Sequence, residues 1–250
     1  MSSPSALSAV ARSLAQHRTR FEALTRPATD VILAEVQQVH EVIDLASGTG
    51  DPALTLAAAL PAARVLATDR FAELLRETER AARARGLSNL QILQTDMHQV
   101  PLTAASVDLV TSRLGLQFAA DVRQVLSEIL RVLKAGGTTC HVAWGATDQP
   151  LLRALLPKDA PFQLGEPGPF QFSRPGSLAK VFADAGFAAV EESTHCADWT
   201  WQGDARSFVN FMQETSGPAR DDALDSLAAF ERHGALIFPV ETHVVRARRP

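Results

Sequence analysis

Short apolar runs alternate with stretches of helical periodicity along the first 145 residues of the chain. The runs have the length and composition of buried strands, and the stretches between them place apolar residues three and four positions apart, as helices do. This alternation favours a parallel sheet wound on both sides, with ligands at the carboxyl ends of the strands. The expected strands are 42–45, 63–68, 89–94, 106–110 and 138–144, and the expected helices between them are 52–60, 71–85 and 122–133.

Helical spacing also predicts two helices before the first strand, at 5–14 and 27–39. Thr25 is a possible N-cap of the second helix, and Pro27 stands just inside its start. Beyond residue 145 the pattern is less uniform, and the segment 151–175 is rich in Pro, Gly, Leu and Phe. The pattern therefore defines the first half of the chain better than the second.

The loop between the first expected strand and helix carries the most distinctive chemistry. Asp44 stands at the end of the strand, and Gly48 and Gly50 permit positive φ and close approach of the backbone to a ligand. Asp51 is a natural N-cap and Pro52 a natural first residue of the helix that follows. The loop thus predicts a strand, a glycine turn and a helix in immediate succession.

Two classes of cofactor compete for this loop. Its two glycines and Ala53 satisfy the relaxed dinucleotide fingerprint, and Asp69 follows at about the ribose-binding distance of ~20 residues. A pyrophosphate needs the bare positive end of the helix, however, and Asp51 places a carboxylate there. With Asp44, that anion favours a ligand with positive charge, such as the amino group and sulfonium of S-adenosylmethionine. An ordinary strand-to-helix turn is the simplest alternative.

Residues 44–50, DLASGTG, resemble motif I of the class I S-adenosylmethionine-dependent methyltransferases, whose usual form is (D/E)-x-G-x-G-x-G. Ala46 replaces the first glycine, a mild departure provided that this residue keeps a negative φ. Segments 106–110 and 131–137 resemble the sFD strand and the RVLKPGG turn of the same family, with alanine for proline at 135. The resemblance covers residues 41 to about 144. It is strongest to small-molecule enzymes of the ubiquinone and menaquinone biosynthesis type, the methyltransferase type 11 group.

The resemblance implies one class I methyltransferase domain over residues 1–250. Its fold would be a Rossmann-like, doubly wound α/β sheet of seven strands, mostly parallel with the last strand antiparallel, and with helices on both faces. The last two strands would lie near 188–197 and 235–246. Cap helices would occupy 1–40, the cofactor-binding half 41–145, and the lid and acceptor-binding half 146–250.

The resemblance also implies how the cofactor is held. Asp69 would accept hydrogen bonds from both ribose hydroxyls, although capping of the next helix is an alternative role for it. Asp96 would bind the adenine amino group, and Met97 would pack against the ring. The full set of expected contacts with S-adenosylmethionine is Asp44, Ala46, Gly48, Gly50, Asp69, Arg70, Asp96, Met97 and Ser112.

Catalytic residues are less evident. Methyl transfer is an in-line displacement at the sulfonium carbon, and positioning can supply much of the catalysis. The candidates are His98, Arg113 and His17, each with a structural alternative. Segment 112–118 lacks the (D/N)-P-P-(Y/F/W) motif of many amino-group methylases of DNA and protein. An apolar acceptor pocket under a lid at 168–173 could be formed by Phe118, Phe162, Phe170, Trp199, Trp201, Phe208, Phe211 and Met212, each of which could equally be core.

The composition of the chain argues against some classes of binding partner. A net charge of -4 and a pI near 6.0 give no electrostatic footprint for nucleic acid. Cys140 and Cys196 have neither metal-type spacing nor the density of a disulfide framework, and the N-terminus lacks the pattern of a signal peptide. We expect no metal, no membrane span, a cytoplasmic location and a small-molecule acceptor, and the oligomeric state stays open.

Three function classes remain at this point. The first is a methyltransferase acting on carbon, oxygen or nitrogen of a small, hydrophobic or aromatic metabolite. The second is a cofactor-binding protein of the same fold, pericyclic-type or regulatory, that transfers no methyl group. The third is a nicotinamide oxidoreductase, against which Asp51 and the turn at 131–137 both argue.

Overall fold

The structure is a computed structural model that describes residues 12–36, 38–151, 167–216 and 222–250. The strands predicted before residue 145 are all present within a few residues of their expected bounds. In chain order the elements are α2 (Arg18–Ala34), β1 (Glu41–Leu45), α3 (Ala53–Ala59), β2 (Arg64–Asp69), α4 (Ala72–Ala84), β3 (Leu90–Gln94), β4 (Val107–Arg113), a 3-10 helix (Leu116–Phe118), α5 (Val122–Val132), β5 (Leu133–Trp144), α7 (Ser177–Asp184), β6 (Ala188–Trp201), α8 (Ala205–Ser216), α9 (Ala223–Ala228), β7 (Glu231–Arg232) and β8 (Ala235–Arg248).

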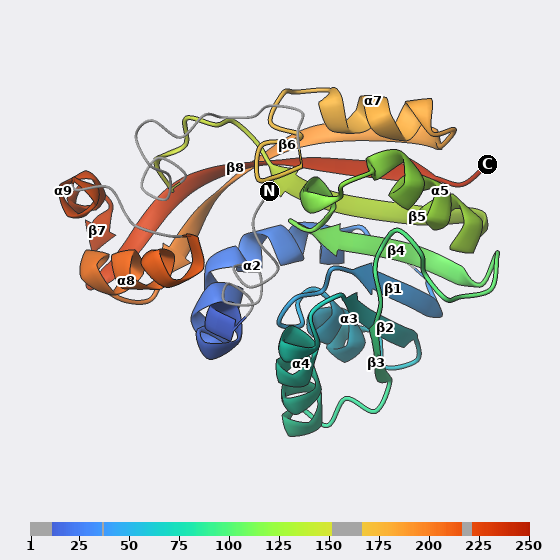
Figure 1. The fold of residues 1–250 in the computed structure, drawn as a ribbon, viewed down its shortest axis with the longest axis horizontal. Helices are drawn as coiled ribbons and strands as arrows, with labels where there is room; N and C mark the ends of the chain where they lie inside the picture. The colour runs from blue at the N-terminus through green and yellow to red at the C-terminus, as the bar shows by residue number, and fades with distance from the viewer. Residues whose placement is uncertain (1–11, 37, 152–166, 217–221) are drawn as a thin grey trace.

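One sheet organises these elements, in the strand order β3-β2-β1-β4-β5-β8-β6. Strands β1 to β5 pair in parallel, and β8 runs antiparallel to both β5 and β6 (Figure 1). The doubly wound sheet with an antiparallel last strand is therefore confirmed. Its order reverses between β1 and β4, which is where ligands bind in open α/β sheets.

The sheet has eight strands among the described residues, one more than the seven expected. The additional strand, β7, has two residues and pairs with the start of β8. His233 and Gly234 join the two strands, and both have positive φ, as a two-residue hairpin turn requires. A strand this short shows no alternation in the sequence and so left no signal.

Helices cover both faces of the sheet (Figure 1). On one face α2, α3 and α8 bury Ile32, Leu56 and Phe208 against the strands. On the other face α5 and α7 bury Leu126 and Phe182. A fully buried side chain of this kind contributes roughly 1.5 to 3 kcal/mol relative to exposure. The sheet is therefore held between two apolar layers.

The second predicted helix, expected at 27–39, differs from the helix in the structure. Helix α2 spans Arg18–Ala34, with Pro27 in its interior, so the expected start at Pro27 and the expected N-cap at Thr25 are wrong. Thr25 instead donates its hydroxyl to the Phe21 carbonyl, 2.8 Å away. An interior proline costs about 3 kcal/mol. Burial of the helix's apolar face against the sheet offsets that cost. The helix expected at 5–14 lies largely outside the described residues.

Candidate functional site

The carboxyl ends of β1, β2 and β4 meet at one edge of the sheet, called here the carboxyl edge. Asp44 pairs in register with Thr111 on β4, whose hydroxyl donates to Asp44 Oδ1 over 2.8 Å. Asp69 ends β2, and Ser112 and Arg113 end β4. Parallel strands therefore bring residues from three distant parts of the sequence to one place.

The glycine loop, residues 46–50, folds back over this edge and is tied to the end of β2. The Ser47 amide donates to the Thr68 carbonyl over 2.8 Å, and the Gly48 amide donates to Asp69 Oδ2 over 2.9 Å. Gly48 and Gly50 have φ of 57° and 126°. A side chain at Gly50 would also collide with Leu54. The loop therefore needs glycine at both positions.

Ala46 departs from expectation, because its φ is +54° rather than negative. The chain leaves β1 at this residue in the left-handed conformation, and the next residue, Ser47, already bonds Thr68 at the end of β2. The Ala46 Cβ has room because residue 115 is glycine: a Cβ built there would lie 2.6 Å from it. Alanine at 46 thus carries strain that glycine would avoid.

Asp51 and Pro52 also differ slightly from their predicted positions. Helix α3 begins at Ala53 and Pro52 is its cap residue, so the assignment of Asp51 as N-cap is wrong by one position. Asp51 Oδ1 nevertheless accepts hydrogen bonds from the Thr55 amide (3.2 Å) and hydroxyl (2.8 Å). Its carboxylate is buried at the start of the helix. The anion expected beside the glycine loop is present.

Asp69 is buried and holds two loops together. Its Oδ1 accepts from the Phe71 amide over 2.9 Å, just before α4, while Oδ2 accepts from Gly48. Burial raises the pKa of this carboxyl, against the opposing effect of those backbone hydrogen bonds. Each carboxylate oxygen can accept a further bond. Anchoring the loop and binding a ligand are therefore compatible roles.

Asp96 and His98 form a pair on the loop after β3. Asp96 Oδ1 accepts from the His98 amide over 2.9 Å and lies 2.5 Å from His98 Nδ1. The Asp121 amide donates to His98 Nε2 over 3.2 Å, so both ring nitrogens are engaged. Burial tends to raise the pKa of Asp96, but the hydrogen bonds from His98 outweigh it and lower the pKa. This geometry fits His98 for holding the loop against α5 rather than for accepting a proton.

The neighbours of Asp96 are placed as follows. Arg70 is exposed, with its guanidinium 5.0 Å from the centre of the Phe71 ring. Met97 is half-buried and packs against the apolar layer on the face of the sheet that α5 and α7 cover. The Asp96 side chain is 55% exposed and is therefore open to a partner from outside the chain.

Asp44 is fully buried and electrostatically unusual. Burial raises its pKa to about 7, partly offset by the Thr111 hydrogen bond, the charge of Arg113 and the nearby Ala53 amide, which is too poorly aligned with Oδ2 to count as a hydrogen bond. Arg113 is itself buried, and its guanidinium donates to the Thr29 hydroxyl on α2 over 2.8 Å. Burial lowers the Arg113 pKa, while the charges of Asp51, Asp44 and Glu22 raise it. The charges of three carboxyl groups, on β1, just after the glycine loop and on α2, thus act on one guanidinium. We call this the carboxylate cluster.

Four polar side-chain atoms at the carboxyl edge are buried and lack a hydrogen-bond partner among the described residues. They are Asp44 Oδ2, Ser47 Oγ, Thr49 Oγ1 and Ser112 Oγ. Buried polar groups in native proteins nearly always have a partner from the protein, from water or from a ligand. A polar ligand with positive charge fits this edge, because it would supply donors to Asp44 and partners to the hydroxyls.

The expected apolar pocket is instead a packed core. Trp201 stacks on Phe211 at 4.9 Å and meets Phe208 edge-on at 5.4 Å. Trp199 and Met212 are buried with them. The remaining members of the expected set are Phe170, which is buried, Phe118, which is 54% exposed, and Phe162, which lies outside the described residues.

His17 joins this core to α2. Its Nε2 lies 2.8 Å from Glu214 Oε2 on α8, and its ring packs edge-on against Phe211 at 5.3 Å. The hydrogen bond from His17 lowers the pKa of Glu214. His17 therefore fixes the start of α2 against α8, which is a positioning role.

Sequence reasoning missed the buried polar face of α2. Glu22, Thr25 and Thr29 are all buried on this helix, at the spacing of one helical face. Polar residues recurring on an otherwise apolar face were the available signal. Their significance depends on what the helix packs against, which the sequence does not show.

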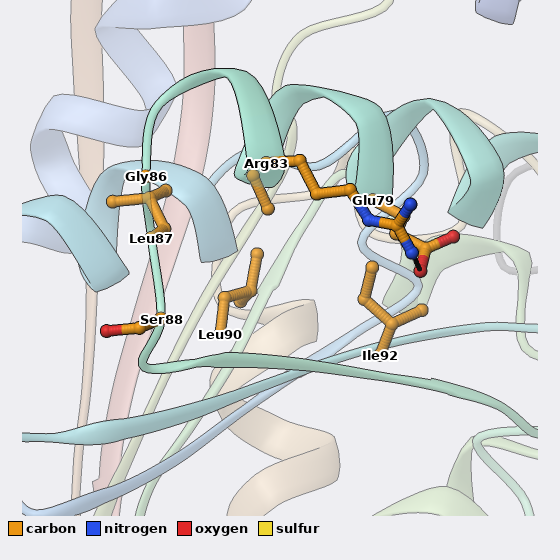
Figure 2. Close-up of a pocket in the computed structure, with 8 residues that line it drawn as sticks. Glu79, Arg83, Gly86, Leu87, Ser88, Leu90 and Ile92 are labelled. Atoms are coloured by element: carbon orange, nitrogen blue, oxygen red, sulfur yellow. Dashed lines mark hydrogen bonds and ion pairs between the residues drawn. The ribbon is translucent and has the colours of Figure 1, made fainter.

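Two hollows elsewhere on the molecule lie apart from the carboxyl edge. One, of about 480 Å³, opens between the end of α4 and β3, with the Glu79–Arg83 ion pair of 2.6 Å beside it (Figure 2). The other, of about 550 Å³, lies between the end of α2 and the Lys134–Gly137 turn. Neither is lined by any residue of the carboxylate cluster.

Metal-binding clusters and membrane-spanning helices are both absent from the described ranges. No group of three or more His, Cys, Asp or Glu side chains there is arranged to hold a metal ion. No helix in the same ranges is long and apolar enough to cross a membrane.

Comparison with known proteins agrees with this geometry. Residues 42–137 match the family described as "Methyltransferase domain". In the solved structure of the YcgJ protein of Bacillus subtilis, 98% of the chain is covered and superposes on 90% of this one, with a TM-score of 0.63 and 18% identity. The fold is therefore that of a Rossmann-like methyltransferase.

Two curated relatives carry the comparison further. The demethylmenaquinone methyltransferase of Thermus thermophilus is 30% identical over 183 residues, which are 67% of this chain and 82% of that one. That of Geobacillus kaustophilus is 30% identical over 173 residues, 62% of this chain and 74% of the relative. The chain therefore belongs to the class I S-adenosylmethionine-dependent methyltransferases, in their small-molecule group. It is an enzyme that uses S-adenosylmethionine as its methyl donor, and the nicotinamide alternative falls away.

Proposed function

We propose that this enzyme methylates a carbon, oxygen or nitrogen atom of a small, hydrophobic or aromatic acceptor, with its cofactor held at the carboxyl edge. The observation that carries the proposal is the set of buried, unpartnered polar atoms around Asp44, beside Asp69 and the glycine loop. The named relatives methylate demethylmenaquinone. A quinone-like ring is therefore the first acceptor to test.

In this proposal the cofactor supplies a methyl group activated on a sulfonium, and the chain binds and orients the reactants. Asp69 accepts hydrogen bonds from the ribose hydroxyls, and Asp44 faces the positive charge. Asp96 and Met97 hold the adenine, with Arg70 beside them. Gly48 and Gly50 admit the cofactor close to the backbone, with Ala46 at the turn. The hydroxyl of Ser112 gives a further polar contact.

The chain's contribution to catalysis is positioning in a water-poor site. Arg113 balances the carboxylates around the amino-acid end of the cofactor. His98 and His17 hold the loop after β3 and the start of α2. We assign neither histidine as a general base, because the ring nitrogens of His98 are occupied and His17 is paired with Glu214.

The direct test is transfer of a labelled methyl group from S-adenosylmethionine to a panel of acceptors. The panel contains demethylmenaquinol, simple phenols and catechols, and a sugar of similar size as the control. We expect label in at least one of the hydrophobic acceptors and none in the sugar. Binding of the cofactor without transfer to any ring acceptor would contradict the proposed acceptor class.

Asp44 predicts a pH dependence of ligand binding. Its pKa is about 7 in the free protein, and a cation placed beside it lowers that pKa. Binding of S-adenosylhomocysteine, whose amino group is that cation, should therefore release a proton at pH 6. Because only the charged carboxylate binds well, affinity should be about tenfold higher at pH 8 than at pH 6.

Titration calorimetry at both pH values, in two buffers with different heats of ionisation, measures the affinity and the proton release together. Asp44→Asn is the matched variant, and it should remove most of the pH dependence. The raised pKa values of Asp69 and Glu22 act in the same direction and account for the remainder. A wild-type affinity that is the same at pH 6 and pH 8 would show that Asp44 does not bind the ligand's amino group.

A further inference from the structure

Glu22 is a buried carboxylate on the helix that overhangs the carboxyl edge. Glu22 is only 7% exposed. Farther along α2, Thr29 bonds Arg113 at the end of β4, and Glu35 at the helix end pairs with Arg246 over 2.7 Å. Arg246 pairs in register with Cys140, well before the carboxyl end of β5. The helix therefore runs from beyond the carboxyl ends of the parallel strands toward their amino ends, with its first turns on the side of the carboxyl edge.

The two oxygens of Glu22 have different surroundings. Oε2 lies 2.5 Å from an Arg18 nitrogen and 3.7 Å from an Arg85 nitrogen. Oε1 is buried and has no hydrogen-bond partner within the described part of the chain. An ion pair made only for stability needs no second, unsatisfied oxygen, since leaving a buried acceptor unpaired is unfavourable. The arrangement suits a donor that arrives with a ligand.

The charges around Glu22 define what that donor is. Burial raises the pKa of Glu22, and the charge of Asp51 raises it further, while Arg18 and Arg113 lower it. Glu22 is therefore within electrostatic reach of Asp51 and Arg113, beside the glycine loop. Arg18 and Arg85 approach only Oε2, so Oε1 is left in need of a donor. A compact cation with several N–H donors meets that need.

We propose that Glu22 binds the α-ammonium group of the cofactor's amino-acid end through Oε1. Helix α2 then contributes to recognition of that end of the cofactor. The inference rests on the proposed function, since it needs the cofactor at the carboxyl edge. It assigns a specificity role to a residue outside the motifs of the sheet. Glu22 would distinguish ligands with a free amino-acid group from adenosine thioethers without one.

The test compares two neutral-sulfur ligands by titration calorimetry at pH 8. S-Adenosylhomocysteine has the ammonium group, and 5′-methylthioadenosine lacks the whole amino-acid end. Glu22→Gln keeps the shape and removes the charge. It should weaken S-adenosylhomocysteine about tenfold or more, and change 5′-methylthioadenosine less than about twofold.

The matched control is Asp30→Asn on the same helix. Asp30 is exposed and pairs with Arg26 over 2.6 Å, so its variant should change neither affinity. Glu22→Asp keeps the charge but shortens the side chain by one methylene. It should also lower the affinity for S-adenosylhomocysteine relative to that for 5′-methylthioadenosine. Should Glu22→Gln not fold, as judged by its circular dichroism, Glu22→Asp carries the same test.

The outcomes separate the inference from the proposal beneath it. Wild-type protein that binds neither ligand overturns the proposed function. Wild-type protein that binds S-adenosylhomocysteine, with the same ratio of affinities in the Glu22 variants, overturns the role of Glu22 alone. Equal weakening of both ligands also overturns it, because that is the signature of a merely structural residue.

Discussion

Arg113→Met is expected to lower the free energy of unfolding by about 3 to 5 kcal/mol at pH 8, the largest effect of any single substitution discussed for this enzyme. Arg113 is buried, and the charges of Asp51, Asp44 and Glu22 favour its charged form, so its removal takes away a cation that acts on all three carboxyls. Methionine is a close match in length and packs well in a core. The loss of stability therefore measures the removal of the positive charge rather than a change in the shape of the side chain.

The loss should shrink as the pH falls. Without Arg113 the pKa values of the carboxylates rise further, so their protonated forms are reached at higher pH. A raised carboxyl pKa in the folded state favours folding at low pH and disfavours it at high pH. The deficit is thus greatest at pH 8 and smaller at pH 5.

Urea unfolding of wild type and variant at pH 5 and pH 8 measures both effects. Arg83→Met is the control, because Arg83 is exposed and pairs with Glu79 on its own helix. It should change stability by less than about 0.5 kcal/mol. Wild-type stability in the Arg113 variant at pH 8 would show that the cluster does not hold charged carboxylates.

Asp69→Ala has the largest expected effect on ligand binding. It should weaken cofactor affinity by about 1 to 3 kcal/mol, or roughly 5- to 150-fold, as loss of charged hydrogen bonds does. Part of the loss comes from the glycine loop, because Asp69 Oδ2 also holds the Gly48 amide. Calorimetric titration with S-adenosylhomocysteine measures the change.

Asp184→Ala is the control for this variant. Asp184 is an exposed acid at the end of α7 that pairs with Lys180 over 2.7 Å, on the other face of the sheet. It should leave affinity unchanged. An Asp69 variant that binds as tightly as wild type would exclude Asp69 from the ribose site.

The parallel half of the fold could be predicted because its signals are local. Each of β1 to β5 is a short apolar run bounded by turn residues, and the spacing of Asp44, Gly48 and Gly50 places the loop between strand and helix. Periodicity does not reveal the conformation of one residue. Ala46 has positive φ, and the room for its Cβ depends on Gly115, which lies far away in the sequence but against it in space.

Errors in the prediction arose where tertiary contacts outweigh local preference. Pro27 stops helices in isolation, yet α2 continues through it because its apolar face packs on the sheet. Trp199 and Trp201 do share one face of β6, as alternation requires, but α8 covers that face with Phe208 and Phe211. An apolar cluster in a sequence does not distinguish a pocket from a core.

The sequence predicts only those residues of the candidate site that belong to a local motif. Asp44 and Asp69 follow from the ends of adjacent strands. Glu22 does not, because its burial arises only when α2 packs against α3 and β4, where the charges of Asp51 and Arg113 act on its carboxyl. A charged residue on a helix normally faces solvent, so nothing local marks this one as buried.

The central claim is that S-adenosylmethionine binds at the carboxyl edge of the sheet. Calorimetric titration of the protein with S-adenosylmethionine, S-adenosylhomocysteine and NAD in parallel tests it most directly, with the Asp69→Ala variant alongside. The account predicts binding of the two adenosyl ligands with dissociation constants on the order of micromolar, weakened in the variant, and no binding of NAD. A folded protein that binds none of the three, or binds NAD alone, would contradict it.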